Sequence, residues 1–154
     1  MNLTTNYLGM ELKNPLVAGA SPLSKEAGTV RELEDAGVSA VVMYSLFEEQ
    51  IEHDATLHDH YMEYGADSFA EALSYVPQQV GFSRGPDEYI EHVAALKAAV
   101  DIPIIASING TSKGGWIEYA RQMEQAGADA IELNLYYVAA DPDTSARDIE
   151  ERYL

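Results

Sequence analysis

The chain has 154 residues, and its 26 acidic against 9 basic side chains give a formal net charge of −17 at pH 7. Because nucleic acids and anionic membrane surfaces are bound through clustered lysine and arginine, this charge argues against both as partners. The sequence has no cysteine, which excludes disulfides, thiolate metal ligands and a cysteine base.

The elements predicted along the chain are short apolar strands that alternate with amphipathic helices. At the start, Leu3–Tyr7 and Met10–Leu12 are expected to form a hairpin around Gly9. Four further strands are predicted at Pro15–Ala20, Ala40–Ser45, Pro103–Ile108 and Ala130–Leu135. Helices are predicted between Ser24, the expected N-cap, and Gly37, at 86–100 and 116–126, and after Ser145, the expected cap of the last helix.

One stretch of the sequence occurs twice, 90 positions apart. Arg31–Met43 returns as Arg121–Leu133, and each copy has the pattern of a helix end, a glycine and a short apolar strand. The glycines, Gly37 and Gly127, are expected to close their helices in the left-handed conformation. Such a β/α repeat predicts a parallel sheet that binds ligands at the carboxyl ends of its strands.

Residues 47–85 form the longest interruption of this repeat, with helical patterns at Phe47–Tyr64 and Asp67–Tyr75. The segment is either a substrate loop or an elaboration of the surface. The rest gives four βα units, whereas a closed barrel needs eight. We therefore expect an α/β fold with a single domain at 1–154, the N-terminal half of a (β/α)8 TIM barrel preceded by a short β-hairpin.

Several short motifs stand out along the chain: Leu8-Gly9, Leu12–Leu16, Ala18–Pro22, the Ala-Gly-x-x-Ala patterns at 36–40 and 126–130, Glu132–Asn134, Ser45–Gln50 and Asn109–Trp116. These motifs resemble the dihydroorotate dehydrogenase family, and more closely the bacterial proteins called dihydroorotate dehydrogenase-like. The resemblance covers essentially the whole chain but only half of the family's barrel. It implies an FMN-dependent oxidoreductase of pyrimidine biosynthesis, which oxidises dihydroorotate to orotate by passing a hydride to the flavin.

The resemblance also implies site residues. The positions expected to bind the cofactor are Ala18, Gly19, Ala20, Ser21, Tyr44, Ser45 and Asn134. Tyr44 stands where the family has a lysine, and Tyr137 stands where the family has its Cys or Ser base, so Tyr137 is the catalytic candidate. An ordinary tyrosine, with a pKa of about 10, is a poor proton acceptor near neutrality.

Two residues are expected to bind substrate. Asn109 belongs to a motif shared with the family, and Lys113 lies in the loop 110–115, which is either an anion site or an ordinary connection. No metal site is expected. The group His53, Asp54, His58, Asp59 and His60 fits a solvated helix face better than a metal centre.

Two functions follow from this sequence. The first is an FMN-dependent enzyme of the dihydroorotate dehydrogenase-like group, acting on a small molecule and inactive as this half alone. Because the family's phosphate site lies beyond Leu154, the chain by itself is expected to bind FMN weakly or not at all. The second is a non-catalytic half-barrel that self-associates. The expected partner is a second copy, as a homodimer, or a complementary C-terminal half-barrel. The start Met1–Tyr7 lacks an apolar leader, so we expect a cytoplasmic protein.

Overall fold

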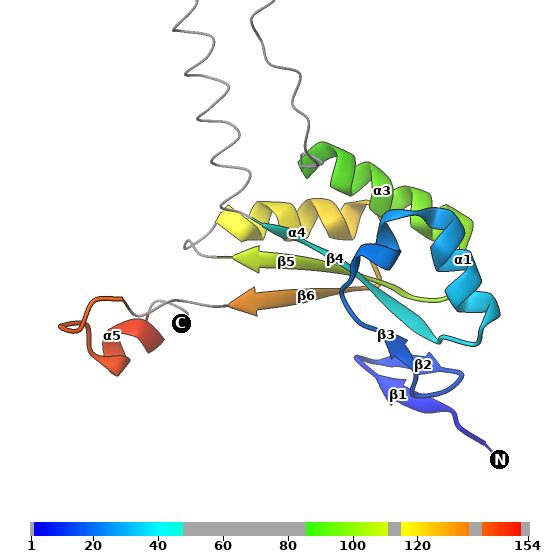
Figure 1. The fold of residues 1–154 in the computed structure, drawn as a ribbon, viewed down its shortest axis with the longest axis horizontal. Helices are drawn as coiled ribbons and strands as arrows, with labels where there is room; N and C mark the ends of the chain where they lie inside the picture. Colours follow the sequence, from blue (N-terminus) through cyan, green and yellow to red (C-terminus); the bar gives the residue numbers. More distant parts are fainter. Residues whose placement is uncertain (1, 48–85, 111–114, 136–139, 152–154) are drawn as a thin grey trace, which may run out of the picture.

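The computed structural model describes residues 2–47, 86–110, 115–135 and 140–151. Four strands form one parallel sheet, in which each strand lies beside its neighbours in the sequence (Figure 1). They are β3 (Val17–Ala18), β4 (Ala40–Phe47), β5 (Ile104–Gly110) and β6 (Ala130–Leu135). This confirms the predicted α/β class and the parallel sheet, an arrangement compatible with part of a TIM barrel.

Three helices pack on one face of the sheet (Figure 1). They are α1 (Ala27–Asp35), α3 (Pro86–Ala99) and α4 (Gly115–Gln125). No helix among the described residues is long and apolar enough to cross a membrane.

The two copies of the repeat have the same backbone structure. Gly37 has a φ of 102° and Gly127 a φ of 97°, as expected for glycines that close helices. Each glycine N–H donates to a carbonyl of the last helical turn, Glu34 O at 2.9 Å in the first copy and Glu124 O at 3.0 Å in the second. The predicted helix–glycine–strand units are confirmed.

The main core lies between the helices and the sheet. Tyr89, Val93 and Leu96 of α3 and Met123 of α4 are fully buried against it. The strands contribute the apolar residues Val41, Met43, Leu46, Ile104, Ala106 and Ile108. Burial of each large side chain contributes about 1.5–3 kcal/mol, so this face holds the helices in place.

A smaller apolar cluster lies on the opposite face of the sheet, on which no helix of the described residues packs and which we call the helix-free face. There Leu12 packs with Ala40, Val42 and Ile105, all of them buried. Leu12 belongs to β2 (Met10–Leu12), which pairs antiparallel with β1 (Thr5–Tyr7). This pair therefore covers the amino-terminal end of the helix-free face and leaves the carboxyl-terminal end to other residues.

The N-cap predicted for the first helix is wrong. Ser24 lies inside a 3-10 turn, η1 (Pro22–Lys25), and α1 begins only at Ala27 after Glu26, which makes no side-chain cap. The Ser24 hydroxyl is buried, and two backbone groups satisfy its hydrogen bonds. It donates to Ser21 O at 2.8 Å and accepts from Tyr44 N at 2.7 Å. Ser24 thus fixes the turn after β3 to the middle of β4.

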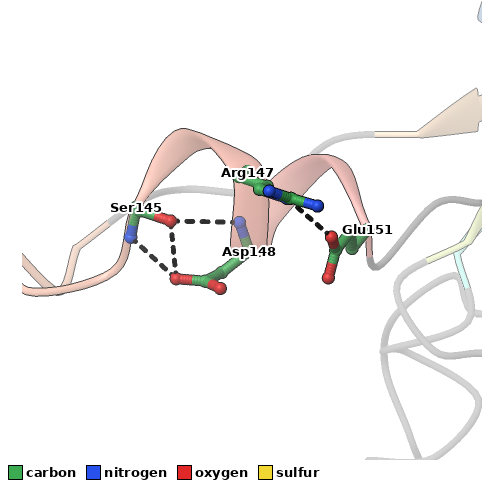
Figure 2. A network of polar contacts seen from close by, with 4 residues as sticks. All are labelled: Ser145, Arg147, Asp148 and Glu151. Atoms are coloured by element: carbon green, nitrogen blue, oxygen red, sulfur yellow. Dashed lines mark hydrogen bonds and ion pairs between the residues drawn. The ribbon is translucent and has the colours of Figure 1, made fainter.

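The N-cap predicted for the last helix is confirmed. In α5 (Ala146–Glu150), Ser145 Oγ accepts from Asp148 N at 3.3 Å, and the Asp148 carboxylate accepts from Ser145 N at 3.1 Å (Figure 2). Arg147 pairs with Glu151 one turn later at 3.0 Å. These local bonds satisfy the first turn of a helix that lies apart from the sheet (Figure 1).

Candidate functional site

Polar side chains gather on the helix-free face, at the carboxyl ends of β4, β5 and β6. In the sheet register Ser45 lies opposite Ser107, and Ser107 lies opposite Glu132. One step further along, Asn109 lies opposite Asn134. We call Ser45, Ser107, Glu132 and Asn134 the polar cluster. It lies at the end of the sheet where parallel β/α proteins bind their ligands.

Hydrogen bonds connect all four members of the polar cluster. The hydroxyls of Ser45 and Ser107 are 2.9 Å apart. Ser107 Oγ donates to Glu132 Oε1 at 2.7 Å. Asn134 Nδ2 lies 3.3 Å from both Ser107 Oγ and Glu132 Oε1. Ser107 is fully buried, whereas Ser45, Glu132 and Asn134 are partly exposed, so the cluster is anchored in the sheet and still open to a ligand.

A bulge in β4 decides which side chains reach this face. The register between β4 and β5 shifts between Val42 and Ser45, so β4 has one residue more than β5 over this stretch. After the shift, the Ser45 side chain lies on the helix-free face beside Ser107, while Tyr44 packs with Met43 in the core on the helix side. An added residue of this kind turns neighbouring side chains to different faces.

The Tyr44 side chain therefore lies on the opposite face of the sheet from the side chains of Ser45 and Asn134. Its ring meets that of Tyr89 edge to face, with centroids 5.1 Å apart, and the His92 ring is 6.2 Å away. Lys25 Nζ lies 5.4 Å from the centre of the Tyr44 ring. The structure does not bring Tyr44 together with the other predicted cofactor residues on these strands.

A residue that the sequence did not single out supports the bulge. The buried Tyr89 hydroxyl accepts from Ser107 N at 2.9 Å and donates to Ser107 O at 3.1 Å, next to the register shift. Burial raises the pKa of this phenol above its usual value, although the hydrogen bond to the Ser107 backbone opposes the rise. The available signal is that Tyr89 extends the apolar stripe of α3, four residues before Val93.

The small residues after Val17 lie at the carboxyl end of β3. Ala18 packs partly buried against the main core, whereas Gly19 and Ala20 are exposed. A Cβ atom at Gly19 would meet nothing within 4 Å, so its backbone is open to an approaching ligand. Ser21 O accepts the hydrogen bond from Ser24 that fixes this turn to β4.

Asn109 and Gly110 end β5 beside the polar cluster. Asn109 is buried between its register partners Phe47 and Asn134. A Cβ atom at Gly110 would lie 2.9 Å from Cδ1 of Trp116, so only glycine allows Trp116 to pack on the strand end. The other predicted substrate residue, Lys113, lies outside the described residues, as do the catalytic candidate Tyr137 and the histidine-rich group at 53–60.

Comparisons with known proteins agree with the family resemblance. The chain is 30% identical over 153 residues to the catalytic subunit of dihydroorotate dehydrogenase B (NAD(+)) from Thermoplasma acidophilum, a match covering 92% of the chain and 47% of that protein. The corresponding subunit from Thermoplasma volcanium is 31% identical over 152 residues, with the same coverage. Both of these curated homologues are dihydroorotate dehydrogenases. The chain spans about half the length of the curated relatives it matches. No family model matches it.

The chain is also similar to a protein with another name. It is 32% identical over 135 residues to a probable 5-dehydro-4-deoxyglucarate dehydratase 2 from Streptomyces coelicolor, which covers 80% of the chain and 40% of that protein. Because a dehydrogenase and a dehydratase both match, the reaction has to be argued from the side chains at the carboxyl ends of the strands.

Proposed function

We propose that this chain forms the first four βα units of a flavin-dependent dehydrogenase barrel that acts on a dihydropyrimidine-like substrate. The observation that carries this proposal is the polar cluster. It joins Ser45 and Asn134, two positions that the family resemblance assigns to the flavin, through hydrogen bonds on the face that would line the barrel. The dihydroorotate dehydrogenase names of the homologues supply the substrate class.

The described residues fit an FMN ring. The exposed residues Gly19 and Ala20 leave room for a flat ring to approach the end of β3, because none of the described residues comes within 4 Å of a Cβ atom built at Gly19. On the neighbouring strands, Ser45 and Asn134 offer polar atoms to the edge of the ring. FMN, when bound, accepts the hydride that the substrate gives up. In the proposal, Ser45 and Asn134 orient the ring, and Tyr137 is the candidate for the proton.

A fluorescence titration tests this function. FMN and lumiflavin, which has the same ring without the ribityl phosphate, are added separately to the purified chain. We expect both to bind weakly and with similar affinity, since the proposed site holds the ring and not the phosphate. Asn134→Leu should weaken both by about tenfold, whereas Gln122→Leu, in the groove between α3 and α4 on the other side of the sheet, should leave both unchanged. Absence of binding at millimolar flavin would contradict the proposal.

The edges of the sheet favour a second candidate function, a half-barrel that pairs with a second copy. In the sheet of the described residues, β3 and β6 are edge strands, and edge strands offer unpaired backbone groups to another chain. In this case sedimentation equilibrium should show a dimer that does not bind flavin. A monomer at all concentrations would rule this candidate out.

A further inference from the structure

We infer that Glu132 is a positioning residue that fixes the direction of every hydrogen bond in the polar cluster, so that the cluster offers only acceptors and selects a ligand edge that donates. Neither the family resemblance nor the names of the homologues assign Glu132 a role. The inference rests on the proposed function for the identity of the ligand. Its first part, the direction of the hydrogen bonds, stands on the structure alone.

The direction begins at the carboxylate. A carboxylate only accepts hydrogen bonds, so the single hydroxyl hydrogen of Ser107 is used on Glu132 Oε1, at 2.7 Å. Ser107 Oγ is then left with two lone pairs. One must accept from the Ser45 hydroxyl at 2.9 Å and the other from Asn134 Nδ2 at 3.3 Å. The Ser107 hydroxyl is thereby satisfied, and Ser45 has no hydrogen left to donate.

The same carboxylate sets the side-chain amide of Asn134. Asn134 Nδ2 lies 3.3 Å from both Glu132 Oε1 and Ser107 Oγ, so its hydrogens point into the cluster. The amide must therefore turn Oδ1 away from Glu132. Reversing this amide would place Oδ1 against the carboxylate, where two acceptors repel.

The oxygen atoms that the hydrogen bonds within the cluster leave available are then all acceptors: Ser45 Oγ through its lone pairs, Asn134 Oδ1 and Glu132 Oε2. Such a surface pairs with N–H groups and leaves a ligand carbonyl without a partner, which penalises the wrong edge. In the oxidised isoalloxazine ring the one ring N–H is at N3. We therefore assign this edge of a flavin, or the N–H edge of a cyclic imide, to the polar cluster.

The hydrogen-bond direction is tested without ligand. In a ¹H–¹⁵N NMR spectrum, the side-chain NH2 of Asn134 should be shifted downfield and protected from exchange with water because it donates to Glu132 and Ser107. Glu132→Ala should move this signal toward that of a free amide, while Glu124→Ala, on the exposed side of α4, should not. An Asn134 signal that is the same in Glu132→Ala and in the wild type would overturn the inference.

The selectivity is tested with a matched pair of ligands, lumiflavin and 3-methyllumiflavin, which lacks the N3 hydrogen. The wild type should prefer lumiflavin by at least about tenfold. In Glu132→Ala the ratio of the two affinities should fall, because Ser107 and Asn134 are free to turn. A merely structural role would weaken both flavins equally and leave the ratio unchanged, and that result would overturn the inference. If Glu132→Ala does not fold, Ser107→Ala, which frees the Ser45 hydroxyl to donate, should lower the ratio in the same way.

Failure of the proposed function has a different signature. If neither flavin binds and the Asn134 signal still depends on Glu132, the flavin proposal is wrong while the direction of the hydrogen bonds holds. The binding of uracil is then compared with that of 1,3-dimethyluracil by saturation-transfer NMR, and this comparison decides the selectivity. Preference for uracil supports it, and equal signals or none overturn it.

Discussion

Tyr44 and Asn134 directly follow the two copies of the sequence repeat at equivalent positions, yet their side chains lie on opposite faces of the sheet. Both copies have the same helix end, the same left-handed glycine and the same strand start. In β6 successive side chains keep alternating between the two faces, so Asn134 lies in the polar cluster with Glu132. In β4 the bulge turns Tyr44 into the core on the helix side, and Ser45 takes the place beside Ser107.

This difference shows that the repeat determines the architecture while one extra residue determines the site. The bulge is held from the helix side by Tyr89, whose hydroxyl bonds both backbone groups of Ser107, and by Ser24, which accepts from Tyr44 N. Residues in the core on one face thus position the ligand-facing residues on the other.

Removal of the Tyr89 hydroxyl should have the largest effect, because this hydroxyl bonds the backbone of β5 beside the bulge in β4. Tyr89→Phe leaves the N–H and the carbonyl of Ser107 without this partner, and each unsatisfied buried group costs about 1–3 kcal/mol. We expect a loss of about 2–4 kcal/mol in the free energy of unfolding, measured in urea. Tyr7→Phe, at an exposed position of β1, is the control and should change it by less than about 0.5 kcal/mol. Equal stability of the two variants would contradict this role of Tyr89.

Addition of a methyl group at Gly110 should have the next largest effect. In Gly110→Ala the new Cβ would lie 2.9 Å from Cδ1 of Trp116, so the indole has to move, at a cost of about 1–3 kcal/mol. Trp116 is the single tryptophan of the chain, so its fluorescence maximum should shift as well. Gly28→Ala, in α1 with nothing within 4 Å of its Cβ, should instead be neutral or stabilising. An unshifted emission maximum in Gly110→Ala would disprove the contact.

The pH dependence of stability should report on Tyr89. Because burial raises the pKa of Tyr89 in the folded state, the neutral phenol stabilises the fold, and that contribution is complete below pH about 10. Above that pH the unfolded chain loses the proton first. The wild type should therefore lose stability by about 1 kcal/mol per pH unit relative to Tyr89→Phe. Parallel curves for the two proteins between pH 9 and about 11 would show that the phenol is not buried.

The smallest effect is expected at the glycine that closes the helix in each copy of the repeat. Gly37→Ala and Gly127→Ala should each cost about 1 kcal/mol, because a residue with a Cβ resists positive φ. The costs should be equal, since the added Cβ meets nothing within 4 Å at Gly37 and only Lys97 Cγ at 3.7 Å at Gly127. Thermal unfolding of the two variants measures this. A cost that differs by more than about 1 kcal/mol would mean that the copies are not equivalent in energy.

The sequence predicted what depends on local patterns. The glycines at 37 and 127 and the cap at Ser145 follow from backbone conformation and nearby hydrogen bonds, which a short stretch of sequence determines. The family resemblance implied that Ser45, Asn134 and Tyr44 bind the cofactor. The structure brings Ser45 and Asn134 into one cluster, whereas it places Tyr44 in the core on the helix side.

What could not be predicted depends on contacts between distant residues. The bulge in β4 has no local signal, because it exists through Tyr89 and Ser24, which are far from it in the sequence. The sequence predicts a helix cap at Ser24 because serine is common there, whereas its hydroxyl bonds a strand amide and the carbonyl of Ser21. Glu132 stood in a recognised motif, but its hydrogen bonds appear only once β5 lies beside β6.

An NMR titration of the chain with FMN tests most directly whether the helix-free face is the ligand site. The largest shifts should occur at the backbone amides of Ser45 and Asn134 and at the Asn134 side chain, with none on the outer helices. Shifts confined to the groove between α3 and α4, around Ile90 and Gln122, would contradict a site at the polar cluster.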